Sequence, residues 1–166
     1  MPGCFKISER RQDFPQPDPL FYLAGGPGQA NVDVARGYVE SWIRNDRDIV
    51  LVNVRGTGGD NNLQCELHSG DENIQGYLED PFDVVEFRKC LEELKKKYDL
   101  TKYASPMAKD DLNDVRKALG YEKINLMGTS GGTRSSLVYM RRHPSDRNLV
   151  FLLMMIYPQF HQIFTL

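Results

Sequence analysis

Long hydrophobic runs are missing from this sequence. The longest extends only from Leu149 to Tyr157, well short of the roughly 18 residues that a membrane-spanning helix needs. The first residues, Met1-Pro2-Gly3-Cys4, also lack the apolar segment of a secretory signal peptide. We therefore expect no membrane span and a cytoplasmic location for the chain as it stands, although its parent protein could still be exported.

The chain also has few cysteines and a small net charge. Its three cysteines have no C-x-x-C spacing, which argues against the common metal and redox motifs. Lysine and arginine total 21 against 23 for aspartate and glutamate, and no dense basic run suggests a nucleic-acid surface. Neither a P-loop signature nor G-x-G-x-x-G is present. The sequence therefore predicts no cofactor, no metal site and no nucleic-acid partner.

What remains is the pattern of a globular α/β protein. With 40% hydrophobic and 27% charged residues, the composition is that of an ordinary folded domain. Short apolar runs alternate with segments of helical periodicity, which predicts a mainly parallel sheet of about four strands flanked by helices. The expected strands are 20–24, 49–54, an apolar strand that starts near Lys123 and runs into Ser130, and 149–156. We expect an extended lead-in over 1–18, an α/β core over 19–157 and an irregular tail over 158–166.

Helices are expected between these strands, at about 33–45, from Asp80, from Ser105 to Gly120, and after Ser130. Asp80 has the features of an N-cap, with Pro81 at the first helical position. The buried face of that helix would contain Val84, Phe87, Leu91 and Leu94, and its exposed side would carry the pairs Glu92–Lys96 and Glu93–Lys97.

Three glycine-rich loops follow strands of this predicted sheet. They are Gly25-Gly26-Pro27-Gly28, the segment 55–60, and Gly128-Thr129-Ser130-Gly131-Gly132. Ligands of parallel α/β sheets bind beyond the carboxyl ends of the strands. Because all three loops lie at those ends, the sequence places its candidate site there.

The third loop fits G-x-S-x-G, the nucleophile elbow, with an apolar strand before it and a helix after it. In that motif Ser130 is the nucleophile and the backbone N–H of Gly131 stabilises the oxyanion. The first loop would supply the second donor, from Gly26 or alternatively from Gly25. The other interpretation of the motif is a glycine-rich turn whose serine caps a helix.

Taken together, segments 21–30, 54–58 and 111–144 resemble the α/β-hydrolase fold and, within it, the prolyl aminopeptidase and tripeptidyl aminopeptidase group of serine peptidases. The resemblance implies a serine hydrolase that releases residues from peptide N-termini and acts on a peptide or a small ester or amide. An esterase or lipase, or a non-catalytic fragment, remains an alternative. The chain departs from the group's pattern at Ala24, Asn53, Asp60 and Gly131.

The resemblance also implies a triad acid and histidine after the nucleophile, and neither is identified in this chain. His68 precedes Ser130, His143 ends the next helix, and His161 lies in a tail unlike the family. We therefore expect a truncated core that is inactive or nearly so by itself. Its apolar edge strands, near 50–52 and 152–154, would leave backbone groups unpaired and favour self-association.

Several other residues carry structural expectations. Arg55 should pair with a carboxylate or cap carbonyls behind the site rather than bind substrate. Asp110, Asp111 and Asp114 should form a solvated helix face. Members of the group often carry cysteines where this chain has Cys65 and Cys90, which implies a disulfide; two separately buried thiols are the alternative. Cys4 is expected to be free.

Overall fold

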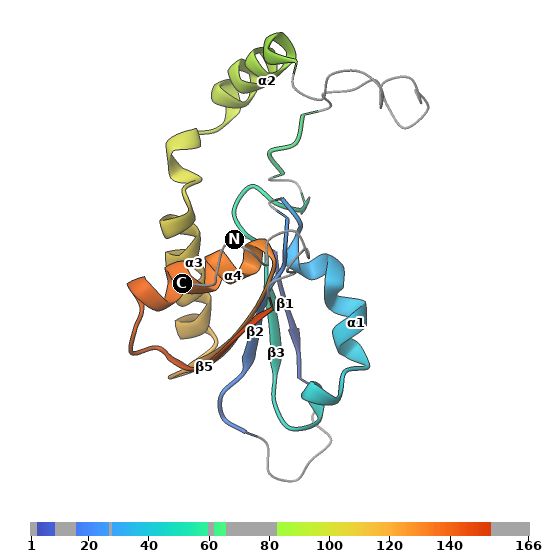
Figure 1. Cartoon of the computed structure of the whole chain (residues 1–166), viewed down its shortest axis with the longest axis vertical. Helices are drawn as coiled ribbons and strands as arrows, with labels where there is room; N and C mark the ends of the chain where they lie inside the picture. The colour runs from blue at the N-terminus through green and yellow to red at the C-terminus, as the bar shows by residue number, and fades with distance from the viewer. Residues whose placement is uncertain (1–2, 9–15, 27, 60–61, 66–82, 154–166) are drawn as a thin grey trace, which may run out of the picture.

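A five-stranded sheet forms the centre of the protein (Figure 1). The computed structural model describes residues 3–8, 16–26, 28–59, 62–65 and 83–153. In spatial order the strands are β1 (Cys4–Ile7), β3 (Ile49–Val52), β2 (Leu20–Leu23), β4 (Ile124–Thr129) and β5 (Arg147–Leu153). Neighbouring strands run parallel except β1, which is antiparallel to β3. The predicted α/β class is confirmed, with five strands instead of about four.

Helices cover both faces of this sheet (Figure 1). α3 (Ser105–Ala118) and α4 (Gly131–Arg142) lie on one face, where Phe21 and Leu23 of β2 join their core. α1 (Ala35–Val39) lies on the other face, against Tyr22. β2 and β3 are therefore buried on both sides, as their unbroken apolar runs predict.

The extended lead-in expected over 1–18 contains a strand, β1, that we did not predict. β1 pairs along its whole length with β3, from Cys4 opposite Val52 to Ile7 opposite Ile49. Ile7 is buried, and Lys6 Nζ lies 3.2 Å from the buried carboxylate of Asp48. These long-range contacts recruit a segment whose own sequence is too short and polar to indicate a strand. The β3 edge that we expected to be open is consequently covered.

The single helix expected at 33–45 is broken into three short pieces. A 3-10 turn (Asn31–Val34) leads into α1, and a second 3-10 turn (Trp42–Asn45) follows. Ser41 caps the second turn by accepting a hydrogen bond from the Ile43 N–H at 3.3 Å. The apolar stripe still packs on the sheet through Val34, Tyr38 and Ile43. Trp42, in contrast, is 78% exposed.

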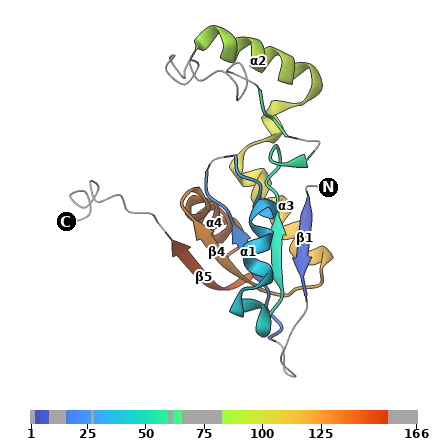
Figure 2. The ribbon, with the colours of Figure 1, turned by 90° about the vertical axis from the view of Figure 1, so that its right-hand side faces the viewer.

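α2 (Val84–Lys97) lies apart from the sheet (Figure 2). Its N-cap is Asp83, whose side chain accepts from two backbone N–H groups; Asp80 and Pro81 lie outside the described residues. The expected buried face is wrong, because the helix buries no residue and Phe87 and Leu91 are each 41% exposed. Its ion pairs are spaced i,i+3, Glu92–Lys95 and Glu93–Lys96, rather than i,i+4.

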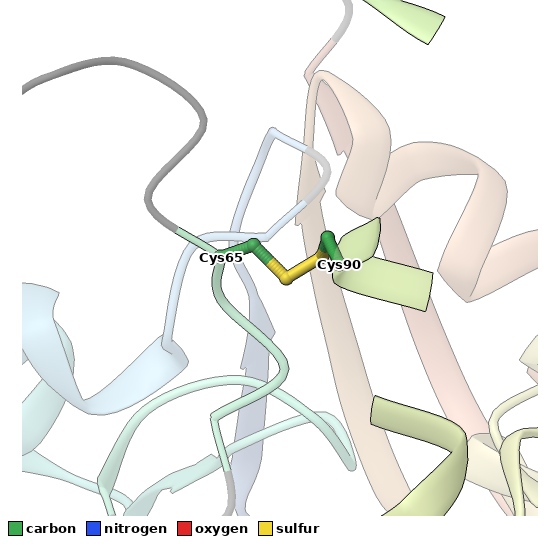
Figure 3. Close-up of a disulfide and its surroundings, with 2 residues drawn as sticks. All are labelled: Cys65 and Cys90. Carbon is green, nitrogen blue, oxygen red and sulfur yellow. A yellow bond between two sulfur atoms is a disulfide. The ribbon is translucent and has the colours of Figure 1, made fainter. Parts of the chain in front are cut away.

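A disulfide between Cys65 and Cys90 attaches α2 to the loop after β3 (Figure 3). The Cα atoms are 5.9 Å apart, within the range that a disulfide can bridge. The pairing implied by the family resemblance is confirmed, and Cys4 is free and exposed. Among the described residues, no helix is both long and apolar enough to cross a bilayer.

α3 forms as the sequence predicts and contributes a buried lysine. Ala108 and Leu112 are buried on its apolar stripe, and Gly120 follows the helix with a φ of 77°. The Lys109 side chain is only 2% exposed, and no hydrogen bond or ion pair joins it to the described residues. Burial lowers the pKa of Lys109 to about 8.

We expect Lys109→Met to raise the free energy of unfolding at pH 7, because the variant removes an amine whose loss of solvation outweighs its attraction to Asp111. Since the pKa of Lys109 in the folded chain lies below its usual value of 10.5, the wild-type chain should gain stability as pH rises from 8 toward 10.5. The difference in free energy of unfolding between Lys109→Met and the wild type should therefore narrow by at most about 3 kcal/mol over that pH range. Urea unfolding of both proteins at pH 7, 8.5 and 9.5 measures this difference. A difference that is constant with pH would contradict this account.

The opposite edge of the sheet exposes apolar side chains. Within the described part of the chain β5 pairs with β4 alone, and Leu149 and Phe151 are about half exposed. They line an apolar groove of about 330 Å³ together with Trp42. Of the two edges expected to promote self-association, only this one therefore lacks a further paired strand among the described residues.

We expect concentration-dependent association of the chain through the β5 edge. Phe151→Lys should shift the population toward monomer, because a lysine on an edge strand opposes strand pairing. Sedimentation velocity over a hundredfold range of concentration is the measurement. Leu137→Lys is the matched control, since Leu137 is 52% exposed on α4 and does not line the groove. Equal association of both variants and the wild type would contradict the prediction.

Candidate active site

Ser130 lies at the turn between β4 and α4, at the carboxyl edge of the sheet. Its backbone has φ 51° and ψ −117°, and it is the only described non-glycine residue with positive φ. An L-residue enters this region only under strain, which the surrounding structure must hold in place. The side chain is exposed rather than buried in the core. The strand, serine and helix expected from the sequence are thus present in the geometry of a nucleophile elbow.

Two glycines of this turn are required by close packing. A Cβ on Gly128 would lie 2.6 Å from Ser136 Oγ and 2.6 Å from the Gly132 carbonyl carbon. A Cβ on Gly132 would lie 2.7 Å from the Leu23 carbonyl carbon and 2.8 Å from the Ala24 carbonyl oxygen. The start of α4 is therefore pressed against the end of β2, and no side chain fits between them.

This packing brings the first glycine loop to Ser130. A Cβ built on Gly25 would lie 3.2 Å from the Ser130 Cβ and 3.7 Å from its Oγ. One built on Gly131 would lie 2.7 Å from the carbonyl oxygen of Gly26. All four residues singled out in the sequence for the nucleophile and the oxyanion donors are consequently neighbours.

A buried asparagine that the sequence did not single out holds the first loop in place. Asn31 is 2% exposed, and its Oδ1 accepts from the Ala24 N–H at 2.7 Å while its Nδ2 donates to the Val52 carbonyl. It thereby joins the ends of β2 and β3. Asn53 contributes a second link, accepting from the Val32 N–H at 3.0 Å. A polar residue after a glycine loop gives no local signal for this role, because both partners are distant in sequence.

A cavity of about 300 Å³ opens beside Ser130. Its wall includes Gly25, Gly26 and Gly131 from the elbow region, and Arg134 from the first turn of α4. Thr57, from the loop after β3, lines the other side. Residues from all three glycine loops therefore meet around one space, as expected for the carboxyl ends of parallel strands.

Arg55 has the structural role that the sequence predicted. Its Nε and Nη2 donate to the two carboxylate oxygens of Asp111 at 2.7 and 2.5 Å, and its Nη1 donates to the Lys102 carbonyl. Hydrogen bonding to Asp111 raises the pKa of Arg55 above its usual value. The pair ties the loop after β3 to α3.

Two of the three aspartates expected on a solvated face of α3 are also paired with arginines. Asp111 pairs with Arg55, and Asp110 accepts from Arg142 at 2.8 and 2.6 Å. The hydrogen bonds from Arg142 hold the pKa of Asp110 below its usual value. Both partners come from elements distant in sequence, which the helical pattern cannot reveal. Asp114 is exposed and faces Lys117 at 3.6 Å.

His143 lies at the far end of α4 from Ser130. Its Nδ1 is 3.2 Å from Asn113 Nδ2, and its Nε2 is 3.2 Å from an oxygen of Asp110. At about 1.5 Å per residue, the helix places it roughly 18 Å along the axis from the elbow. His143 is thus not positioned to accept the Ser130 proton; His68 and His161 lie outside the described residues. No cluster of His, Cys, Asp and Glu able to hold a metal occurs within the described ranges.

Known structures share this architecture. A proline iminopeptidase from Mycobacterium smegmatis is 19% identical, with a TM-score of 0.53 over 87% of this chain and 37% of that chain. A marine microorganism esterase is 13% identical, with a TM-score of 0.54 over 91% and 40%. An N-acyl homoserine lactonase is 13% identical, with a TM-score of 0.50 over 89% and 40%. At such identities the similarity shows the fold alone, and this chain spans about two fifths of those chains or slightly less.

A search of curated proteins found no match. The family model of the alpha/beta hydrolase fold, in contrast, matches residues 18–153. This range includes β2 to β5, the three glycine loops and the elbow. With the order of the strands and the geometry at Ser130, this match shows that the chain belongs to the α/β hydrolase family.

Proposed function

We propose that this chain is the core of a serine hydrolase in which Ser130 is the nucleophile. The observation that supports this most directly is the positive φ of Ser130 at a strand-to-helix turn, where a serine is held out of the sheet beside a cavity. A serine that merely capped the helix would accept a backbone hydrogen bond through its side chain, and no such bond is present at this cap.

In the proposed reaction Ser130 Oγ attacks the carbonyl carbon of an amide or ester. The new Oγ–C bond forms a tetrahedral oxyanion, for which the N–H of Gly131 and that of Gly26 are the proposed donors, with Gly25 as the alternative to Gly26. The C–N or C–O bond then breaks and the leaving group departs with a proton. Water releases the acyl group from Ser130 and regenerates the hydroxyl.

The hydroxyl proton needs a base, and the described residues do not place one at Ser130. A serine without a neighbouring base is a weak nucleophile. Loss of the triad histidine in related chemistry lowers kcat by a factor on the order of a million. We therefore propose that the chain by itself turns over slowly or not at all, and that activity belongs to a protein that adds an acid and a histidine.

For the substrate we propose a peptide cleaved near its N-terminus. The support is the sequence combination of Gly-Gly-Pro-Gly, Arg-Gly-Thr-Gly and the elbow, in that order. A proline iminopeptidase is among the similar structures, but so are an esterase and a lactonase. Ester hydrolysis is therefore the second candidate, and a chain without any turnover is the third.

We expect a fluorophosphonate to form one covalent adduct at Ser130, slowly, because the hydroxyl is exposed but has no base beside it. Intact-mass measurement followed by peptide mapping detects the adduct. Ser130→Ala should abolish it, whereas Ser145→Ala should not, since Ser145 is an exposed serine beyond the far end of α4. An adduct that persists in Ser130→Ala would remove Ser130 from the nucleophile role.

We also expect aminoacyl and tripeptidyl p-nitroanilides to be hydrolysed by this chain at close to the buffer rate. Short-chain p-nitrophenyl esters, tested in parallel, distinguish the peptidase from the esterase. Substantial amide turnover that is lost in Ser130→Ala would contradict the proposal that the chain lacks a base, and it would indicate His161 as that base. Turnover of esters alone, dependent on Ser130, would favour the esterase.

A further inference from the structure

A second and larger cavity, of about 650 Å³, opens at the same edge of the sheet. It lies between the glycine loop after β3 and the segment 97–103 that joins α2 to α3. Val54 and Thr57 line this cavity and also the one beside Ser130. The two cavities therefore adjoin at Val54 and Thr57.

The acidic groups of this cavity are already occupied. Asp111 accepts both hydrogen bonds of the Arg55 fork, which also neutralises that guanidinium. Asp99 caps the short turn after α2, accepting from the Thr101 N–H at 3.1 Å and from its hydroxyl at 2.6 Å. Asp111 is thus neutralised by Arg55, whereas Asp99 is exposed and its carboxylate interacts with Lys102.

Two amines of the cavity, in contrast, form no salt bridge with a described residue. They belong to Lys97 and Lys102, which line the cavity and are both exposed. The preceding lysines of α2 differ in this respect, because Lys95 and Lys96 are each paired with a glutamate. The charge that the cavity presents to a ligand is therefore positive.

An aromatic pair lies beside these amines. The rings of Tyr98 and Tyr103 pack edge to face with their centroids 6.3 Å apart, and both residues are half-buried in the cavity wall. Such a pair offers a flat apolar surface with little conformational entropy left to lose. Apolar walls with a few converging polar groups are typical of small-molecule sites.

We propose that this cavity binds the leaving-group end of a short peptide with a free C-terminal carboxylate. Lys97 and Lys102 bind the carboxylate, and the last side chain packs on Tyr98 and Tyr103. The proposal rests on the proposed function, since Ser130 supplies the cleavage point at the other end of the cleft. It assigns the substrate class as short peptides whose C-terminus ends within the cleft, in preference to folded proteins or C-terminally capped peptides.

The experiment measures binding without turnover. The full chain carrying Ser130→Ala is titrated by calorimetry with Gly-Phe and, at the same pH, with Gly-Phe amide. The free acid should bind at least about tenfold more tightly, because only it forms charge-assisted hydrogen bonds with the two amines. Lys97→Gln and Lys102→Gln should each remove most of that preference while leaving the weak binding of the amide unchanged.

Lys123→Gln is the matched control, because Lys123 is an exposed lysine before β4, at the amino end of the sheet. It should bind both peptides as the parent does. Equal affinity for acid and amide, or a preference that survives both cavity variants, would overturn the proposal. The calorimetry uses a chain without the nucleophile. Its result therefore does not depend on whether Ser130 reacts with the fluorophosphonate.

Discussion

The contact between the start of α4 and the end of β2 is the constraint on which the rest of the site depends. The Gly132 backbone lies so close to the Leu23 and Ala24 carbonyls that even a methyl group would collide. Because β2 is the middle strand and pairs with both β3 and β4, this contact fixes two glycine loops relative to each other. It also holds Ser130 in a backbone conformation that an isolated turn would relax.

The carboxyl edge of the sheet is completed by polar links between distant segments. Asn31 joins the ends of β2 and β3 inside the protein, and the Arg55–Asp111 pair joins the loop after β3 to α3. Buried polar groups of this kind are costly unless they are fully hydrogen-bonded, so they specify one arrangement of the loops. Two cavities that share Val54 and Thr57 in their walls open at this edge.

Other parts of the chain expose apolar surface that a folded core would normally cover. The α2 face with Phe87 and Leu91, and the β5 face with Leu149 and Phe151, lie in different parts of the molecule. This chain covers about two fifths, or slightly less, of the length of the similar structures. Because α2 buries none of its own residues, the disulfide at Cys90 is what attaches this helix to the loop after β3.

The sequence by itself determined the buried strands, the parallel α/β class, the elbow around Ser130 and the start and end of α3, since each depends on local patterns of apolar residues, glycines and caps. Only the tertiary structure decided that 4–7 forms a strand, that Asp110 and Asp111 are paired, and that α2 lies away from the sheet. The strand and the ion pairs depend on partners tens of residues away in the sequence. A periodic pattern shows which face of a helix is apolar, but it does not specify which segment covers that face.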